Sequence, residues 1–313
     1  MPIFLLSPAK MQNFAPCEET YARYLPRDLD LTQKILARCR QLSVSEIKKT
    51  MNVSDSIAHG AAESFELWES REGEAKPALY AYTGFAYRGL DAGQITKKEA
   101  EWLNDHLRII SGFYGALRPL DRIRPYRLEM AAKGIMGAGT MREFWTQRVT
   151  KRIGEDLAKL PKDQQFIVNL ASEEYSRAVD FAALNVAVYT CHYKAPTIYA
   201  KFFRGMYIRH AGKGRYTTPQ DLTTYRGDSG EFYVQKETEE SDVKKSVRFP
   251  KGHFEIYFAK SGHPNPLETS AATRKKAKTR ESVVSKPSKP AKRKSSSPPI
   301  ANVKRPRRTK RGN

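Results

Sequence analysis

The residues best suited to chemistry in this chain are basic side chains crowded into one short stretch. Five arginines, interleaved with aromatic residues, fall within twenty positions: Arg108, Arg118, Arg122, Arg124 and Arg127. Guanidinium groups bind phosphate oxygens through paired hydrogen bonds, so several of them on one turn would neutralise a segment of nucleic-acid backbone. Pairing of some arginines with Asp121, Glu129 and neighbouring acids, which would lock an irregular loop, is the alternative. The stretch predicts a phosphate-binding surface, with internal pairing left open.

A second basic candidate follows the first apolar run of the chain. Ser7-Pro8-Ala9-Lys10 comes directly after Ile3–Leu6, and α/β proteins place ligand groups just past a strand. Lys10 is therefore a candidate to hold a phosphate or a carbonyl oxygen. A strand-to-helix turn capped by Ser7 would explain the same residues.

A polar cluster follows another apolar run, Phe166–Leu170, in the same way. Asn169, Glu174 and Tyr175, together with Lys10, are the candidates for catalysis. An amide, a carboxylate and a phenol at one strand end suit the recognition of a base edge or the stabilisation of an oxocarbenium-like transition state. Helix capping by Ser172, with acids favoured at a helix N-terminus, explains the cluster equally well.

Three further cations lie at the end of the segment 197–202 and just beyond it. Lys201, Arg204 and Arg209 would extend a basic surface, or simply lie exposed, and Gly205 would let the backbone approach a ligand closely. With Lys10 and the five arginines, they complete the residues predicted to contact nucleic acid.

Metal, cofactor and disulfide chemistry have little support in the sequence. The six histidines form no HxxxH or similar pair, so we expect neither a metal nor a cofactor. Cys17, Cys39 and Cys191 are an odd number at unrelated spacings, which argues against a disulfide-linked framework or partner. Cys191 precedes His192, but a Cys at the end of a strand is usually inert core. Neither a leader nor a membrane span is apparent, so we expect a cytosolic protein without a membrane partner.

The charge of the chain is concentrated at one end. Of 313 residues, 55 are Lys or Arg and 34 are Asp or Glu, for a formal charge of +21. Residues 263–313 alone hold 16 Lys or Arg and two acids. Since this segment has almost no large apolar residue, we expect a disordered basic tail over 261–313 after a globular domain over 1–260. In a eukaryotic source, Lys304–Arg311 would indicate nuclear import.

Periodicity indicates a mixture of helices and strands over 1–260. Strands are expected at 3–6, 166–170, 185–190 and 197–202. Capping boxes at Ser43-x-x-Glu46 and Thr140-x-x-Glu143 begin two helices, and apolar residues at helical spacing predict further helices over 57–68 and 103–114. The predicted fold class is α/β, as a mixed α+β single domain.

One long block resembles a known family. Residues 107–130, LRIISGFYGALRPLDRIRPYRLEM, are very similar to the signature of the YaaA (DUF328) peroxide stress family. Four shorter blocks agree with it in the order of the family: Ser7–Lys10, Gly84-x-x-Tyr87-x-Gly89-Leu90, Asn169–Tyr175, and Arg204-Gly205-Met206-x-x-x-Arg209. Phe85 departs from the pattern, because bacterial members often carry an acid there.

The resemblance implies a single α/β domain and a role in limiting iron-driven damage during hydrogen peroxide stress. It also implies binding of double-stranded DNA through a basic cleft with a helix-hairpin-helix element. Binding of duplex DNA is therefore the predicted function. The alternative is a nucleobase- or nucleoside-processing enzyme, of glycosidase or base-exchange type, that uses the strand-end polar residues; an iron-restraining module without catalysis is a third hypothesis.

Overall fold

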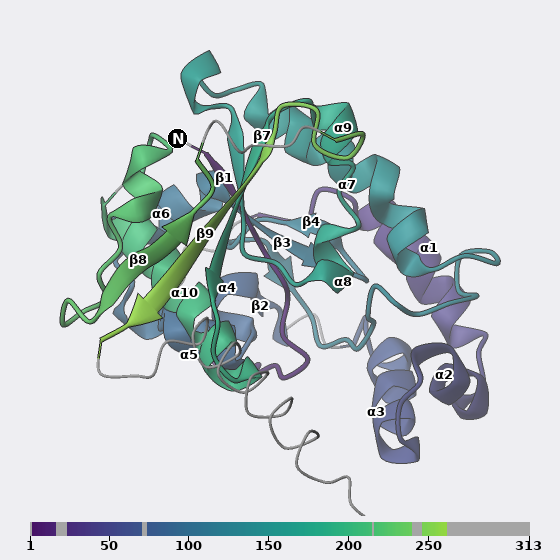
Figure 1. Cartoon of the computed structure of the whole chain (residues 1–313). Helices are drawn as coiled ribbons and strands as arrows, with labels where there is room; N and C mark the ends of the chain where they lie inside the picture. The colour runs from purple at the N-terminus through teal and green to yellow at the C-terminus, as the bar shows by residue number, and fades with distance from the viewer. Residues whose placement is uncertain (1, 17–23, 71–73, 215, 240–245, 262–313) are drawn as a thin grey trace, which may run out of the picture. The chain divides into compact units, whose positions relative to one another are not determined.

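A seven-stranded sheet organises the chain, with the strands in the order β4-β3-β1-β6-β7-β9-β8 (Figure 1). The computed structural model describes residues 2–16, 24–70, 74–214, 216–239 and 246–261, all within one unit, Met1–Glu268. The predicted tail lies outside the described residues from position 262 onward. The strands are β1 (Ile3–Leu6), β3 (Leu107–Ser111), β4 (Gly115–Leu117), β6 (Phe166–Asn169), β7 (Ala187–Tyr193), β8 (Phe232–Glu237) and β9 (His253–Lys260).

The sheet is parallel in its interior and antiparallel at its two edges. β1 pairs in parallel with β3 and β6, β6 with β7, and β7 with β9, whereas β4 and β8 are antiparallel edge strands. Interior strands covered on both faces need apolar residues throughout. Every residue of Ile3–Leu6 is accordingly at most 1% exposed. The fold is mixed α/β, as the sequence predicts.

Helices cover the sheet on both sides. In Figure 1, α1 and α7 lie to one side of the sheet, and α5, α6 and α10 to the other. The helices are α1 (Leu29–Arg40), α2 (Val44–Met51), α3 (Asp55–Glu66), α4 (Ala78–Ala81), α5 (Phe85–Leu90), α6 (Lys97–His106), α7 (Met141–Leu157), α8 (Glu173–Ser176), α9 (Phe181–Leu184) and α10 (Thr197–Gly214). Short 3-10 turns cover Ala92–Gln94, Lys162–Gln164 and Gln220–Thr223, and β2 (Lys76–Pro77) pairs with β5 (Arg122–Ile123).

The predicted helix starts are confirmed. Ser43 caps α2 and Thr140 caps α7, each in a reciprocal box with the glutamate three residues later. Thr96 and Glu99 form a third box at the start of α6. In each box the hydroxyl oxygen accepts a backbone N–H of the first turn, which would otherwise lack a partner.

Two predicted elements are wrong. The helix predicted over 103–114 ends at His106, and Leu107–Ser111 is strand β3, in which all five residues are buried. The strand predicted over 197–202 is the first part of α10. A fully buried strand has no alternation, so its apolar residues also fit a helical spacing.

Glycines allow α5 and α10 to cross at very short range. A Cβ on Gly205 would overlap the carbonyl oxygen of Ala86, and one on Gly89 would overlap that of Phe202. Neither glycine has room for a side chain. The sequence predicts that a ligand approaches the backbone closely at Gly205, whereas the structure places helix α5 there.

Candidate nucleic-acid interface and strand-end site

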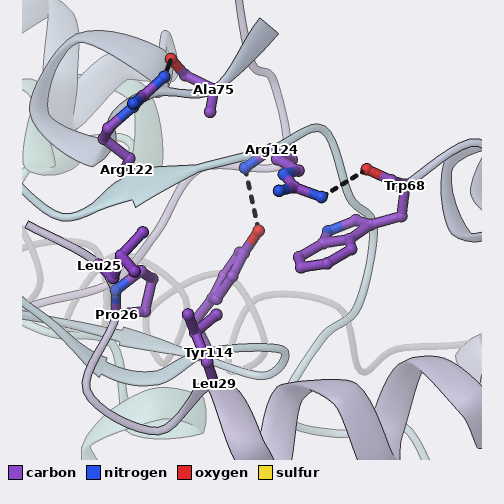
Figure 2. Close-up of a pocket in the computed structure, with 8 residues that line it drawn as sticks. All are labelled: Leu25, Pro26, Leu29, Trp68, Ala75, Tyr114, Arg122 and Arg124. Atoms are coloured by element: carbon purple, nitrogen blue, oxygen red, sulfur yellow. Dashed lines mark hydrogen bonds between the residues drawn. The ribbon is translucent and has the colours of Figure 1, made fainter. Parts of the chain in front are cut away.

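The arginine-rich segment forms an irregular turn after β4, which we call the arginine turn (Arg118–Arg127). Two of its side chains border a small apolar pocket of about 60 Å³ (Figure 2). Arg124 lies over the ring of Trp68, 4.2 Å from its centroid, and donates from Nη1 to the Trp68 carbonyl at 3.0 Å. Arg122 is exposed, and within the described residues its side chain makes one hydrogen bond, to the Ala75 carbonyl at 3.4 Å. The turn therefore presents two cations beside an aromatic wall.

Other arginines of the signature block pair with nearby acids, the alternative that the sequence left open. Arg118 Nη2 lies 2.7 Å from Oδ1 of Asp121, a fully buried carboxylate. Arg127 Nη2 lies 2.9 Å from Glu129 Oε1. Arg118 also stacks on Tyr24, 4.8 Å from the ring centroid. These pairs hold the shape of the turn.

Arg108 lies in the interior. It is 3% exposed, and its Nε donates to Asp156 Oδ2 at 2.6 Å. Three backbone carbonyls, those of Asn104, Asp105 and Leu107, accept its remaining hydrogen bonds. Burial alone would raise the pKa of Asp156, but the ion pairs with Arg108 and Arg27 outweigh burial and lower it. This arrangement favours a structural role for Arg108 over contact with a ligand.

A helix pair packs beside the arginine turn. α2 and α3 lie side by side (Figure 1) and are joined by a three-residue connection in which Asn52 has a left-handed backbone, with φ of 52°. Phe65 at the end of α3 and Trp68 beyond it contact the ring of Phe113, with centroids 5.8 and 6.2 Å apart. The resemblance implies a helix-hairpin-helix element, and this pair of helices with its short connection is the candidate for it. Gly112–Gly115, by contrast, closes a β-hairpin between β3 and β4.

The loops after β1 and β6 meet at one end of the sheet, because the two strands are parallel neighbours. The backbone N–H of Ser172 donates to Ser7 Oγ at 2.9 Å. Lys10 Nζ lies 2.8 Å from Glu129 Oε2, which joins the first loop to the arginine turn through a carboxylate shared with Arg127. Lys10, Arg127 and Glu129 border a space of only about 10 Å³, which has room for about one water molecule.

The Glu174 carboxylate at this end of the sheet has one oxygen without a hydrogen-bond partner among the described residues. Its Oε1 is buried and accepts no hydrogen bond within the described residues. Burial and the nearby Glu129 carboxylate raise the pKa of Glu174, and Lys10 opposes them. A carboxyl group held in this way is suited to proton transfer. The neighbouring Tyr175 is buried, and burial raises the pKa of its hydroxyl well above the usual value.

Sequence reasoning missed a group of buried hydroxyls behind these loops. Tyr126 Oη lies 2.6 Å from Tyr82 Oη and 2.8 Å from Ser111 Oγ, and Tyr87 Oη donates to the Ser7 carbonyl at 3.1 Å. Burial raises the pKa of Tyr126 to about 12. No motif marks them, since they come from separate segments, and at neutral pH they are uncharged hydrogen-bonding groups.

The remaining predicted residues lie apart from Lys10, Glu174 and Arg127. Asn169 accepts a hydrogen bond from the Ala171 N–H and lines a different cavity, together with Arg204. Arg209 pairs with Asp91 and Asp228, at 3.2 and 2.6 Å. Lys201 is exposed. Lys10, Glu174 and Arg127 are thus brought together, and Asn169 and Arg204 form a second group.

Several side chains bear on the other predictions. Cys39 and Cys191 are buried free thiols, and burial raises the pKa of each to about 12; Cys17 is outside the described residues. Within those residues, no group of three or more His, Cys, Asp or Glu side chains has the arrangement of a metal site. Phe85 begins α5 with Arg88 over its ring. None of the described helices combines the length and the apolar character that crossing a bilayer requires.

Comparisons with known proteins cover most of the chain. The sequence profile of the family described as "Peroxide stress protein YaaA" matches residues 2–238. A UPF0246 protein of Paracidovorax citrulli is 36% identical over 232 residues, which are 70% of this chain and 89% of that protein. UPF0246 proteins of Maricaulis maris and Clostridium perfringens are 36% and 33% identical, over 75% and 74% of this chain and 91% and 94% of their own lengths. The chain belongs to the YaaA peroxide stress protein family.

Proposed function

We propose that this chain binds double-stranded DNA and thereby protects it during hydrogen peroxide stress, with the arginine turn and the α2–α3 helix pair as its contact surface. The observation that carries the proposal is the placement of Arg124 over Trp68, with Arg122 on the border of the same pocket. Cations interleaved with aromatic rings suit a phosphate backbone, because they offer charge and a rigid wall together.

The two arginines are suited to phosphate in complementary ways. Arg122 is exposed and gives up only one long hydrogen bond on turning to a phosphate. Stacking on Trp68 holds Arg124 in place, so less side-chain entropy is lost on binding. Arg118 and Arg127 stabilise the turn through Asp121 and Glu129 and support the surface indirectly.

The helix pair adds a second contact. Ser54 caps α3, and its side chain accepts the N–H of Ile57. A helix N-terminus attracts anions, because its first N–H groups point outward with the positive end of the helix dipole. Lys48 in the last turn of α2 pairs with Asp55 at the start of α3, at 2.8 Å, and Lys49 adds positive charge nearby.

Fluorescence anisotropy with a short labelled duplex tests this interface. The double variant Arg122→Gln, Arg124→Gln should bind more weakly, and the plot of log affinity against log salt should become less steep by about 0.9 for each phosphate that is no longer neutralised. Lys97→Gln, which removes an exposed cation on α6, is the matched control and should change the slope little. An unchanged slope in the folded double variant would contradict the assignment of this surface.

A second candidate function is the processing of a nucleobase or nucleoside, and Glu174 is the observation that favours it. Its buried, unbonded Oε1 and raised pKa suit a general acid. The space beside Lys10 is water-sized, so a base would enter only after the Lys10–Glu129 pair opened. Glu174→Gln keeps the shape of the side chain and should abolish base release while DNA affinity stays intact. No base release by the unaltered chain from any nucleoside or duplex would exclude this candidate.

The cellular setting is part of the proposal. A cytosolic location fits a family whose relatives named above come from bacteria. Lys304–Arg311, outside the described residues, would act as a nuclear signal only in a eukaryotic host.

A further inference from the structure

A second cavity, of about 360 Å³, lies at a step in the sheet. β6 ends at Asn169, which is in register with Thr190, whereas β7 continues to Tyr193 beside β9. Because β6 ends before β7 does, a space remains beside His192 and Glu255. Arg204 of α10 lines another side of this cavity. A volume of this size is typical of sites for small organic molecules.

Two guanidinium groups line this cavity without forming an ion pair to any carboxylate of the described residues. Within the described residues, neither Arg204 nor Arg248 takes part in an ion pair or a side-chain hydrogen bond. Arg248 lies against the rings of Phe181 and Phe249, 5.5 and 5.1 Å from their centroids. Burial lowers the pKa of Arg204, which reports the cost of holding this charge away from water without a counter-ion.

The acids of the cavity are already engaged by other residues. Glu173 pairs with Arg177 at the end of α8. Glu255 accepts a hydrogen bond from Tyr257 Oη at 3.0 Å and lies 3.2 Å from His192 Nε2. That nitrogen is buried and lacks hydrogen-bond geometry to any group in the described chain. The cavity is therefore lined by two guanidinium groups, by Glu173 whose charge is paired with Arg177, by the Glu255 carboxylate with neutral partners, and by an imidazole nitrogen without a hydrogen bond in the described chain.

The histidines are neutral polar groups in this setting. Burial lowers the pKa of His192 and of His253, although Glu255 opposes the effect at both. His253 Nε2 lies 2.8 Å from Thr190 Oγ1, and its ring stacks on Phe249 at 4.4 Å between centroids. Because the imidazoles are uncharged, the two arginines are the cations that attract an anionic ligand, and the Glu255 carboxylate opposes them.

We propose that this cavity binds a small organic phosphomonoester, with Arg204 and Arg248 holding the phosphate. A phosphomonoester is close to a dianion at neutral pH, which suits two guanidinium groups that form no ion pair within the described residues. Its organic part fills the remaining volume beside Phe249 and His253. The site is distinct from the proposed DNA surface, because the arginine turn follows β4 at one edge of the sheet, whereas the cavity lies over β7 and β9 toward the other.

Isothermal titration calorimetry of the full chain tests the inference with four probes: adenosine 5′-monophosphate, ribose 5-phosphate, adenosine and inorganic phosphate. The two phosphomonoesters should bind, and adenosine should bind at least about 10-fold more weakly, since it lacks the charged group. Adenosine binding as tightly as its monophosphate would overturn the inference. Inorganic phosphate as tight as both esters would also overturn it, because the cavity would then recognise no organic part.

Substitutions locate the site. Arg204→Gln and Arg248→Gln should each weaken binding of the tighter ester by about 10- to 100-fold. Lys213→Gln, which removes an exposed cation from the same helix as Arg204, should leave it unchanged. Arg248 is exposed, so its variant stays informative even if Arg204→Gln fails to fold. Full affinity in Arg248→Gln would contradict the proposed site, and duplex binding should persist in both variants.

Discussion

At the scale of single residues, the type of an arginine does not reveal its role; its partner does. The sequence predicted five arginines of one block as phosphate ligands, and the structure divides them. Arg108 is enclosed with Asp156, and Arg118 and Arg127 pair with acids two or three positions away. The short-range pairs were foreseeable as an alternative. The partner of Arg108 lies 48 residues away, and no spacing rule reaches that far.

The Arg108–Asp156 pair gives a prediction about stability. Asp156→Asn leaves a buried guanidinium without its counter-charge, and the free energy of unfolding should fall by about 3 kcal/mol. Urea denaturation at pH 7 measures the loss. Glu101→Gln breaks the exposed pair with Lys97 and should change the free energy by less than about 0.5 kcal/mol. Equal effects of the two substitutions would contradict a special role for the buried pair.

The same pair predicts a dependence on pH. The pKa of Asp156 is lower in the folded chain than the ordinary aspartate value of about 3.9. Its stabilising contribution is therefore complete above about pH 5 and is lost as the pH falls through the folded pKa. The difference in unfolding free energy between the unaltered chain and Asp156→Asn should shrink between about pH 5 and pH 3. A difference that stays constant over this range would show that the charge of Asp156 is not its source.

Glu174 is predicted to behave in the opposite sense. Its pKa is raised in the folded chain, so its ionised form opposes folding above that pKa and its protonated form does not. Glu174→Gln should raise the melting temperature slightly at about pH 8, and the gain should vanish near about pH 4. Because the side chain is half-buried, solvent screening keeps the gain below about 1 kcal/mol. A lower melting temperature of the variant at the higher pH would contradict the burial argument.

At the scale of elements, local signals placed the helix starts but not every element type. Ser43 and Thr140 fix the beginnings of α2 and α7 because a capping box acts within four residues. The segment 197–202 is rich in β-branched and aromatic residues, yet it belongs to α10, whose buried positions Phe203, Tyr207 and Ala211 recur every four residues beyond it. The β propensity of these six residues is a weaker determinant of their structure than the apolar periodicity of the whole 18-residue helix.

The crossing of α5 and α10 gives a prediction at this scale. Gly205→Ala sets a methyl group against the Ala86 carbonyl, and the two helices must separate, at a cost of about 3 kcal/mol. Gly60→Ala is the matched control, because this helical glycine has open space around its Cβ position. The control should gain about 0.5 to 1 kcal/mol, since alanine restricts the unfolded chain. Thermal denaturation compares the two, and equal melting temperatures would contradict the close crossing.

The sequence correctly places the polar residues at the carboxyl ends of strands. It does not predict which of them lie together. Lys10 and Glu174 meet around Glu129, whereas Asn169 faces the larger cavity with Arg204. The difference arises from where β6 ends relative to β7, a matter of register. Register depends on pairing between strands that are distant in the sequence, so it could not be derived from either strand alone.

At the scale of the whole molecule, charge divides between the described fold and the segment beyond it. Residues 263–313 carry 16 of the 55 basic residues with only two acids. Deleting residues 262–313 should flatten the plot of log DNA affinity against log salt, because released counter-ions scale with the phosphates neutralised. Anisotropy titrations from about 50 to 200 mM salt measure both slopes. Identical slopes would remove the basic segment from the proposed interface.

The order in which the sheet is assembled has a consequence for biosynthesis. The final strand, β9, is not at an edge; it fits between β7 and β8, both of which are made earlier. While the chain is still emerging from the ribosome, β7 therefore exposes the hydrogen-bonding groups of one side, and β8 has no neighbour to join. The sheet is complete only after residue 260 has been synthesised. A nascent chain stalled before that point is therefore the form most accessible to chaperones and proteases.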